Sequence, residues 1–399
     1  MSQILRFNYK AFCVLLLGLV FSTSAMAGSD AKKEGFDPAV PAFHHIADAN
    51  VFSIGPIQIP LPYILYVPGE GWHTGMSSAF GITMPHGDGL KAIDRFVLHG
   101  GRIKRIQDPN FPMGEVTLGA DHDALHKLWH GEQSLSLNDK TYNLAYDNSS
   151  TADGGVFGGG ITSYYDFSIT KNVMSMFLVC GFLFFLFRGI AKKYATREGK
   201  APIGAQGFIE PIFVFIQDEV AIPFLGKDWE RFLPFLMTLF FFILGLNLFG
   251  QIPFLGNANV TGNLAVTMVL AIITFIVTTI NGNKHYWEHT LWMPGVPSLL
   301  KILILTPVEV MGLFIKPLTL MLRLFANITA GHMVMVIFVG LIFLFGQNVT
   351  LPTLATAIPS MLLTMFMMAI ELLVAFIQAF VFTILTASYL GAATEEAHH

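Results

Sequence analysis

The chain has 399 residues, of which 53% are hydrophobic and only 13% are charged, and its mean hydropathy is +0.58. This composition excludes an ordinary water-soluble globular protein and indicates a polytopic membrane protein. The formal net charge of −4 gives no indication of a nucleic-acid partner. The two cysteines, Cys13 and Cys180, allow at most one disulfide, and we expect none.

Residues 1–27 have the features of a secretory signal peptide. Arg6 and Lys10 form a charged start, Ala11–Phe21 an apolar core, and Ala25-Met26-Ala27 a small-residue cleavage site. This apolar core is too short to cross about 30 Å of hydrocarbon. We therefore expect cleavage, with the mature N-terminus outside the cytoplasm.

Residues 28–165 predict an exported domain that contains small β-hairpins. Short alternating runs are typical of strands, and they occur at Arg95–Leu98, Arg102–Ile106, Ser134–Leu137 and Tyr142–Tyr146, with His99-Gly100-Gly101 as one turn. The stretch Asp147–Ser163 is rich in Gly and Ser, which indicates a flexible linker.

Three histidines of this domain, His122, His126 and His130, recur at helical steps of four. They could line one helix face and bind a metal. An exposed polar helix face is the simpler interpretation, because the spacing fixes no carboxylate or cysteine ligand. We therefore assign no metal and no cofactor.

Residues 166–399 carry five apolar stretches, and the first three indicate the orientation of the chain. Asn172–Phe187 is followed by a basic run, so this span should run from outside to inside; the run comprises Arg188, Lys192, Lys193, Arg197 and Lys200. Spans at Phe232–Gly250 and Asn263–Ile280 then form a hairpin whose outer loop has no Lys or Arg. The distribution of basic residues and the number of spans together place the C-terminus in the cytoplasm.

Residues 205–225 separate the first span from this hairpin. They are amphipathic, are interrupted by Pro211 and carry three acidic residues, Glu210, Asp218 and Glu219. Such a segment is typical of a helix that lies on the membrane surface, here the cytoplasmic one.

The last two apolar stretches are unusually long. As one helix, Lys301–Phe345 would measure about 68 Å, over twice the hydrocarbon thickness. A hairpin would need a polar turn, and the middle offers only Lys316-Pro317, so we expect one helix, kinked near Pro317 and steeply tilted. A loop, Gln347–Pro359, then leads to Ser360–Leu390, which would measure about 47 Å as a helix and should also tilt.

The expected fold is therefore an all-α polytopic membrane protein with a small, β-containing exported N-terminal domain. It should have four to five membrane helices, the last two long and tilted, and an amphipathic surface helix. Its expected divisions are 1–27, 28–165 and 166–399.

An arginine in the middle of the penultimate helix is the most informative residue. Inserting Arg323 near the bilayer centre costs about 2.5–3.5 kcal/mol, and its guanidinium stays protonated. Glu309, Lys316 and Arg323 follow at steps of seven, so they share a helix face, with Asn327 one turn beyond. An arginine with a purely structural role would not require further polar residues along the same helix face.

The last helix carries a similar stripe of Thr364, Glu371 and Gln378, again at steps of seven. Two membrane helices with polar stripes favour an ion path, because ionisable residues inside membrane spans usually mark such paths.

The string Arg323-Leu-Phe-Ala-Asn327, followed by Ala330-Gly331 and preceded by Lys316-Pro317, resembles the signature of subunit a of the F-type ATP synthase. The run Ile377–Leu390 resembles the last helix of that family, and the motifs follow in the family's order. The resemblance covers residues 166–399 and, weakly, His44–Tyr66.

This resemblance implies a non-catalytic stator subunit with two offset half-channels, which carry protons to and from a carboxylate on a ring of c subunits. Arg323 resembles the essential arginine that separates the half-channels, and Asn327 and Gln378 resemble polar neighbours of the rotor contact. His332 and Glu371 stand where many relatives carry a carboxylate and a histidine respectively. We expect this exchanged pair to relay protons in the outer half-channel.

Other polar residues are weaker candidates for lining the channel. Glu309 would help line the inner path, and Lys316 would lie near the cytoplasmic surface, while Thr364 continues the stripe of the last helix. Several relatives carry an aspartate before the proline that corresponds to Pro253, but this chain has no acid there. The outer path would then use polar residues of the first hairpin, namely Asn247, Gln251 and Asn263.

The partners implied by the resemblance are the c-subunit ring, b-type peripheral stalk subunits, the remainder of the ATP synthase and membrane lipids. The implied location is the bacterial inner membrane. One departure stands out, because the exported segment is much longer than the family leads one to expect.

Two other classes of function stay open. Arg323 could bind an anionic substrate in an ion-coupled secondary transporter, although such proteins favour repeated halves and the sequence shows no internal repeat. His285-Tyr-Trp-Glu288-His289 fits the H-x-x-E-H zinc-hydrolase pattern. It lies in a short loop with no third ligand indicated, so we interpret it as a chance match.

Overall fold

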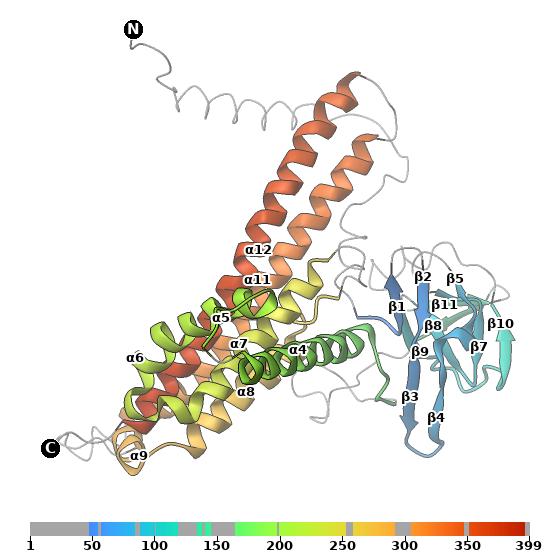
Figure 1. Ribbon diagram of the computed structural model, residues 1–399. Coiled ribbons are helices and arrows are strands. Elements are labelled where there is room, and N and C mark those ends of the chain that lie inside the picture. The colour runs from blue at the N-terminus through green and yellow to red at the C-terminus, as the bar shows by residue number, and fades with distance from the viewer. Residues whose placement is uncertain are drawn as a thin grey trace, which may run out of the picture. The chain divides into compact units, whose positions relative to one another are not determined.

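The computed structural model describes residues 48–54, 57–83, 88–99, 101–118, 134–137, 140–144, 164–197, 199–252, 258–291, 305–346 and 351–395 (Figure 1). The predicted signal peptide, the three histidines His122, His126 and His130, and the linker Asp147–Ser163 lie outside these residues. Within the described part, strands come first and long helices follow. This order confirms the expected fold class of a helical membrane protein with a small β-containing N-terminal domain.

The N-terminal strands form antiparallel sheets of two to four strands. A four-stranded sheet has the order β10-β7-β8-β9 and a three-stranded sheet the order β13-β3-β4, while β1-β2, β5-β6 and β11-β12 are separate pairs. Their bounds are β1 Val51–Ile54, β2 Ile57–Pro60, β3 Pro62–Val67, β4 Gly71–Met76, β5 Ile82–Thr83, β6 Asp88–Gly89, β7 Lys91–Ile93, β8 Phe96–His99, β9 Arg102–Arg105, β10 Glu115–Thr117, β11 Ser134–Leu137, β12 Lys140–Asn143 and β13 Tyr165–Asp166.

The first predicted hairpin is confirmed, and the second is present, with its last strand beginning two residues earlier than predicted, at Lys140 instead of Tyr142. β8 pairs with β9 across the expected turn, with His99 opposite Arg102. β11 pairs with β12, with Ser134 opposite Asn143. In the first hairpin, all four residues of β8 are buried and β9 buries its two middle residues, so neither strand alternates between a buried and an exposed face.

The core of this domain lies under β3, β8 and β9. Leu65, Phe80 and Ile103 are fully buried in it, together with Tyr164. The hydroxyl of Tyr164 donates a hydrogen bond of 2.9 Å to the carbonyl oxygen of Ile103. This bond satisfies a buried polar atom, as buried tyrosines require.

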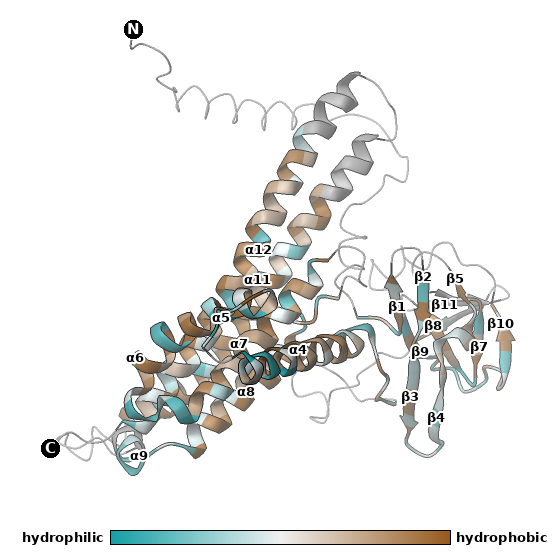
Figure 2. Cartoon of the chain, viewed as in Figure 1, coloured by the Kyte–Doolittle hydropathy of each residue, from teal (hydrophilic) through white to brown (hydrophobic). Residues whose placement is uncertain are grey.

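The first membrane-length helix, α4 (Lys171–Thr196), contains the predicted span and its basic end. α7 (Trp229–Gly250) and α8 (Leu264–Ile280) match the predicted hairpin to within a few residues. At the start of α8, the side chain of Asn263 accepts a hydrogen bond from the backbone N–H of Ala265 at 2.9 Å, which caps the helix. Figure 2 shows the apolar character of these helices.

Pro211 does not interrupt the segment that precedes α7, so this part of the prediction is wrong. Helix α5 (Ala205–Ile216) runs through it and continues as the π-helix η2 (Gln217–Ala221) and the short helix α6 (Ile222–Leu225). A proline removes only one backbone N–H, and helices of membrane proteins tolerate such a loss where neighbouring groups compensate. The break comes later, at Gly226, whose φ of +54° favours glycine, before the 3-10 turn η3 (Gly226–Asp228).

Two long helices, α11 (Thr306–Gly346) and α12 (Leu351–Thr394), complete the described chain and run side by side (Figure 1). At 1.5 Å per residue they measure about 62 and 66 Å. The prediction of one helix rather than a hairpin around Pro317 is confirmed. The predicted loop Gln347–Pro359 is wrong, because α12 already begins at Leu351. Pro352 stands in the first helical turn, where a proline costs no hydrogen bond.

The helices share a core around α7. Leu236, Phe240 and Ile243 are fully buried there, and they belong to one cluster with Leu324 of α11 and Phe382 of α12. Among the described residues, four helical stretches are long and apolar enough to cross a membrane, and α8 is a shorter apolar helix. The chain is therefore a multi-pass membrane protein.

The C-terminal end of α12 is hydrogen-bonded to Asn283, in the connection between α8 and a short helix, α9 (Lys284–Leu291). The backbone N–H of Asn283 donates to the carbonyl oxygen of Ala393 at 2.8 Å, and its side-chain amide donates to that of Thr394 at 2.7 Å. Two of the carbonyl groups that every helix leaves unpaired at its C-terminus are thus satisfied by one residue.

Candidate functional site

Helix α11 has two contrasting faces. Lys316, Arg323 and Asn327 are exposed on one of them, and Glu309 is half-buried. The other face is buried against the neighbouring helices and consists of Leu320, Leu324, Ile328 and His332. His332 is nine positions from Arg323, about half a turn out of phase, so an exposed guanidinium and a buried imidazole share one helix without sharing a face.

The polar stripe of α12 differs from that of α11, because all three of its members are buried. Thr364, Glu371 and Gln378 are 9%, 5% and 8% exposed. The hydroxyl of Thr364 donates to the carbonyl oxygen of Ser360 at 2.8 Å, so its main partner is its own helix. The stripe of α12 therefore lines the interior of the bundle, while that of α11 lies on the outside.

His332 and Glu371 meet in this interior. Nδ1 of His332 lies 3.5 Å from Oε1 of Glu371, and both side chains are only 6% exposed. Among the described residues, Oε1 of Glu371 has no hydrogen-bond partner, which leaves it able to accept a proton or a water molecule.

Two glycines make room for this pair. A Cβ on Gly331 would lie 3.3 Å from Oε1 of Glu371. A Cβ on Gly250 would lie 2.9 Å from the carbonyl oxygen of Ala258 and 3.6 Å from Nε2 of His332. Gly331 therefore allows the close approach of α12 to α11, and Gly250 allows the connection at Ala258 to approach the end of α7.

The polar residues at the end of α7 bond to α12 at Glu371 and one turn beyond it. Gln251 donates its side-chain amide to the carbonyl oxygen of Glu371 at 2.8 Å. Asn247 donates to the carbonyl oxygen of Ala375 at 3.1 Å and accepts from the hydroxyl of Thr261 at 2.7 Å. Asn263 instead caps α8, so the structure brings two of the three hairpin candidates to the pair.

A pocket opens beside Glu371. Gln251, Ile252 and Leu248 line it from α7 and the turn after it, Met335 from α11, and Met368, Ala369 and Leu372 from α12. Through this pocket, the otherwise buried Glu371 can be reached from the surface of the helical bundle.

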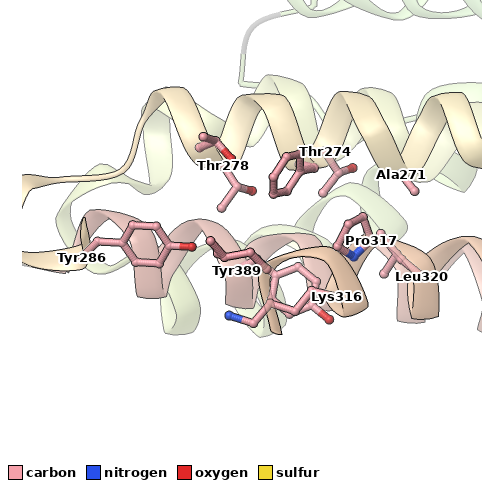
Figure 3. Close-up of a pocket in the computed structure, with 11 residues that line it drawn as sticks. Ala271, Thr274, Thr278, Tyr286, Lys316, Pro317, Leu320 and Tyr389 are labelled. Atoms are coloured by element: carbon pink, nitrogen blue, oxygen red, sulfur yellow. The ribbon is translucent and has the colours of Figure 1, made fainter. Parts of the chain in front are cut away.

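A second pocket lies on the other side of Arg323 along α11 (Figure 3). Lys316, Pro317 and Leu320 of α11 face Thr274 and Thr278 of α8 across it, and Tyr286 and Tyr389 close its end, as Figure 3 shows. On the helix axis, Lys316 stands about 10 Å before Arg323 and His332 about 14 Å after it. The two pockets therefore lie at different depths, with Arg323 between them.

Hydroxyl groups give the second pocket its polar character. Thr274 and Thr278 are 2% and 7% exposed, and their Oγ1 atoms have no hydrogen-bond partner among the described residues. Buried hydroxyls in such a position usually bind water. The pKa of Tyr286 is raised, first by burial and then by the charge of Glu309, so Glu309 acts close to this pocket.

Sequence reasoning missed these residues. Thr274, Thr278, Tyr286 and Tyr389 were not among the candidates, although Thr274 and Thr278 are spaced by one helical turn on one face of α8. Lys316 was a candidate, and its Nζ lies 5.6 Å from the centre of the Tyr389 ring, within range of a cation–π interaction.

The H-x-x-E-H string forms part of helix α9. There the carboxylate of Glu288 lies 3.3 Å from Nζ of Lys284, one turn earlier, and both side chains are exposed. This is an ordinary surface ion pair between positions i and i+4. Among the residues that the structure describes, no group of three potential metal ligands comes together.

Comparison with known proteins gives two family matches. Residues 173–391 match the family described as ATP synthase A chain, and residues 42–124 match a domain of unknown function (DUF8433). These two ranges fall on the helical part of the chain and on its β-containing part.

Individual relatives are similar to the helical part. The ATP synthase subunit a of Chloroherpeton thalassium is 38% identical over 241 residues, which are 59% of this chain and 69% of the relative. That of Myxococcus xanthus is 40% identical over 241 residues, 59% of this chain and 75% of the relative. That of Anaeromyxobacter dehalogenans is 41% identical over 235 residues, 57% and 58% of the two chains.

Proposed function

The chain belongs to the ATP synthase A chain family, and from this premise we propose that it is the non-catalytic stator subunit of the Fo sector. It carries protons to and from a carboxylate of the c-subunit ring through two offset half-channels. One observation carries the proposal, namely that Arg323 is exposed on α11 between a pocket lined by Glu371 and a pocket lined by Thr274 and Thr278.

The exposed face of α11 suits a moving partner helix. Thr319, Ala326 and Asn327 are exposed one turn before and after Arg323, so the guanidinium stands among small and polar side chains. Ala326 and Ala330 are exposed beside it, and small residues allow another helix to approach closely. In lipid alone the arginine would cost about 2.5–3.5 kcal/mol, whereas a passing carboxylate would pair with it.

Arg323 controls the charge of that carboxylate. Near the guanidinium the ionised form is favoured, because opposite charges attract more strongly at low dielectric constant. Away from it, in an apolar environment, the carboxylate must be neutral. The ring site therefore releases its proton on reaching Arg323 and must take up another before moving on. The fixed positive charge also blocks protons from passing directly between the half-channels.

His332 and Glu371 serve the outer half-channel. Their separation of 3.5 Å lets a proton pass between carboxylate and imidazole with a small movement or through one water molecule. The pocket beside Glu371 supplies the entry, with Gln251 in its lining, while Asn247 is buried nearby against Ala375 of α12. Asn327 and Gln378 are the proposed polar neighbours of the rotor contact.

The second pocket is the proposed inner half-channel. Thr274 and Thr278 offer hydroxyls to water molecules, and Glu309 and Lys316 stand towards the proposed cytoplasmic end. A proton released at Arg323 would then leave through this hydrated path. Asn263 and Thr364 keep structural roles in this scheme, because their side chains bond to the backbone of the same helix end or turn.

The proposed setting follows from the same scheme. Residues 1–27 are a cleaved signal peptide, 28–165 an exported domain and 166–399 the channel domain, with the C-terminus in the cytoplasm of a bacterial cell and the spans in its inner membrane. Residues 205–225 lie on the cytoplasmic surface. The c ring, b-type peripheral stalk subunits and the remainder of the ATP synthase are the partners.

Proton flux in vesicles containing the reconstituted complex tests the proposal. Arg323→Ala should abolish ATP-driven acidification while detached ATP hydrolysis continues, and His289→Ala should leave both unchanged. Acidification that persists in Arg323→Ala vesicles would overturn the proposal. Uptake of an anion that depends on Arg323 but not on the ring would instead favour the secondary transporter, and loss of activity in His289→Ala the metallohydrolase.

A further inference from the structure

The three-stranded sheet β13-β3-β4 has an apolar outer face. Along β3 the side chains alternate, with Tyr63, Leu65 and Val67 buried in the domain core and Ile64 and Tyr66 on the other side. On the same side β4 exposes Trp72, Thr74 and Met76, because Trp72 pairs with Tyr66 and Thr74 with Ile64. Trp72 is 63% exposed and Met76 45%.

Four aromatic rings form a continuous cluster on this face. The ring of Trp72 lies 5.0 Å from that of Tyr66 and 5.8 Å from that of Phe167, and Tyr66 lies 6.3 Å from Tyr165. Phe167 is 58% exposed and Tyr165 38%. Such a cluster is unusual on the outside of a half-buried antiparallel sheet, where polar residues are normally found.

The outward residues of β3 and β4 and the two aromatic residues at β13 carry no formal charge; they are Pro62, Ile64, Tyr66, Trp72, Thr74, Met76, Tyr165 and Phe167. The acidic residues of the same sheet are paired with arginines elsewhere in the domain, and Asp166 of β13 lies 3.5 Å from Arg102. Glu70, in the turn between β3 and β4, accepts hydrogen bonds from Arg95 and Arg105. An uncharged aromatic surface of this size marks a contact site.

The chain itself keeps this face close to the membrane. Phe167 precedes Lys171, the first residue of the membrane helix α4, by four positions, a distance of at most about 14 Å for an extended chain. The intervening residues are fixed to β3, because the backbone N–H of Phe167 donates to Ile64 at 2.8 Å and that of Ile169 to Pro62 at 3.2 Å. The sheet therefore cannot move far from the start of the span.

We propose that the face formed by these eight residues rests in the headgroup region of the outer leaflet. Tyrosine and tryptophan favour this region, because their rings are apolar while their N–H and O–H groups can bond to water and lipid carbonyl groups. The lack of charge means that binding does not depend on anionic lipids. This contact holds the exported domain against the membrane beside α4.

A nitroxide label at position 74 tests the proposal in the full-length chain, incorporated in phosphatidylcholine nanodiscs. Thr74→Cys, with Cys13 and Cys180 replaced by serine, places the label at the centre of the face and leaves all four rings in place. Oxygen, which concentrates in lipid, and a nickel chelate, which stays in water, then report the label's surroundings. A label on Cys180 itself, which is exposed on α4, provides the lipid reference.

The matched control is Asn110→Cys, at an exposed site of the same domain away from this face. We expect oxygen accessibility to exceed nickel accessibility at position 74 and the reverse at position 110. Adding Trp72→Ser and Phe167→Ser should shift position 74 towards nickel. Nickel accessibility in the unchanged face would show it to be in water, and low accessibility to both reagents would show it to be covered by protein. Either result overturns the proposal.

Discussion

The two faces of α11 hold ionisable side chains in opposite surroundings, one buried and one exposed. On the buried face, Nδ1 of His332 lies 3.5 Å from Oε1 of Glu371 in the same chain, so the base and the acid are buried together. On the exposed face, Arg323 is surrounded by small and polar side chains. In the scheme proposed above, the buried pair passes protons within the subunit, whereas Arg323 acts only when another protein brings a carboxylate to it. One helix then serves both roles.

The largest effect should come from the exposed face. Arg323→Lys keeps a positive charge but loses the planar fork, and it introduces an amine that can deprotonate in an apolar setting. We expect ATP-driven acidification of reconstituted vesicles to fall to the background leak. Asn327→Gln, one turn along the same face, is the matched control and should retain most activity. Pumping by Arg323→Lys at near the unaltered rate would show that permanence of the charge is unimportant.

The next largest effect should come from the buried pair. Groups that transfer protons typically contribute about 100-fold or more to a rate, so His332→Ala and Glu371→Gln should each slow proton flux by roughly that factor. The exchange His332→Glu with Glu371→His keeps one acid and one base in contact, and its flux should exceed that of either single exchange variant. A double variant no better than the worse single one would contradict the relay.

A smaller effect is expected from the two threonines of α8 that line the second pocket. Thr274→Val and Thr278→Val keep the side-chain shape but remove hydroxyls available to water. At about 1 kcal/mol per hydrogen bond, each change should lower flux roughly fivefold. Thr383→Val is the control, because that buried hydroxyl already donates to the carbonyl oxygen of Ala379 at 2.8 Å. Equal losses at positions 274, 278 and 383 would indicate a general packing defect instead of a water path.

The smallest effect is expected from a change in packing at Gly250, beside His332. Gly250→Ala adds a methyl group 2.9 Å from the carbonyl oxygen of Ala258, and such overpacking destabilises a protein by about 1–3 kcal/mol. Gly312→Ala, on α11, meets nothing within 4 Å and should be neutral or stabilising by up to about 1 kcal/mol. Thermal unfolding midpoints of the purified chain measure both. A midpoint for Gly250→Ala at or above that of Gly312→Ala would show that the connection at Ala258 is not packed tightly against Gly250.

The sequence predicts the helices and the main charges well, for identifiable reasons. Long apolar runs leave few alternatives to membrane helices, and a lone arginine inside one of them is conspicuous. The pairing of His332 with Glu371 was expected only through the family resemblance, because nothing in the spacing within one helix reveals a contact with another. The buried character of the α12 stripe also depends on how α12 packs against α7 and α11.

Threonines and prolines show where sequence reasoning falls short. Thr364, Thr383 and Thr386 donate to carbonyl groups of their own helix, whereas Thr274 and Thr278 do not, and no local pattern separates the two kinds. Pro211 and Pro352 resemble helix breakers in sequence. Their effect depends on the position in the helix and on whether neighbouring groups compensate the missing N–H, which only the assembled structure reveals.

The fastening of α12 by Asn283 has a mechanical consequence. Because this one residue holds the last carbonyl groups of the helix through both its backbone and its side chain, α12 cannot slide along its own axis without breaking two hydrogen bonds together. The end of α12 and the connection between α8 and α9 therefore move together unless both bonds break.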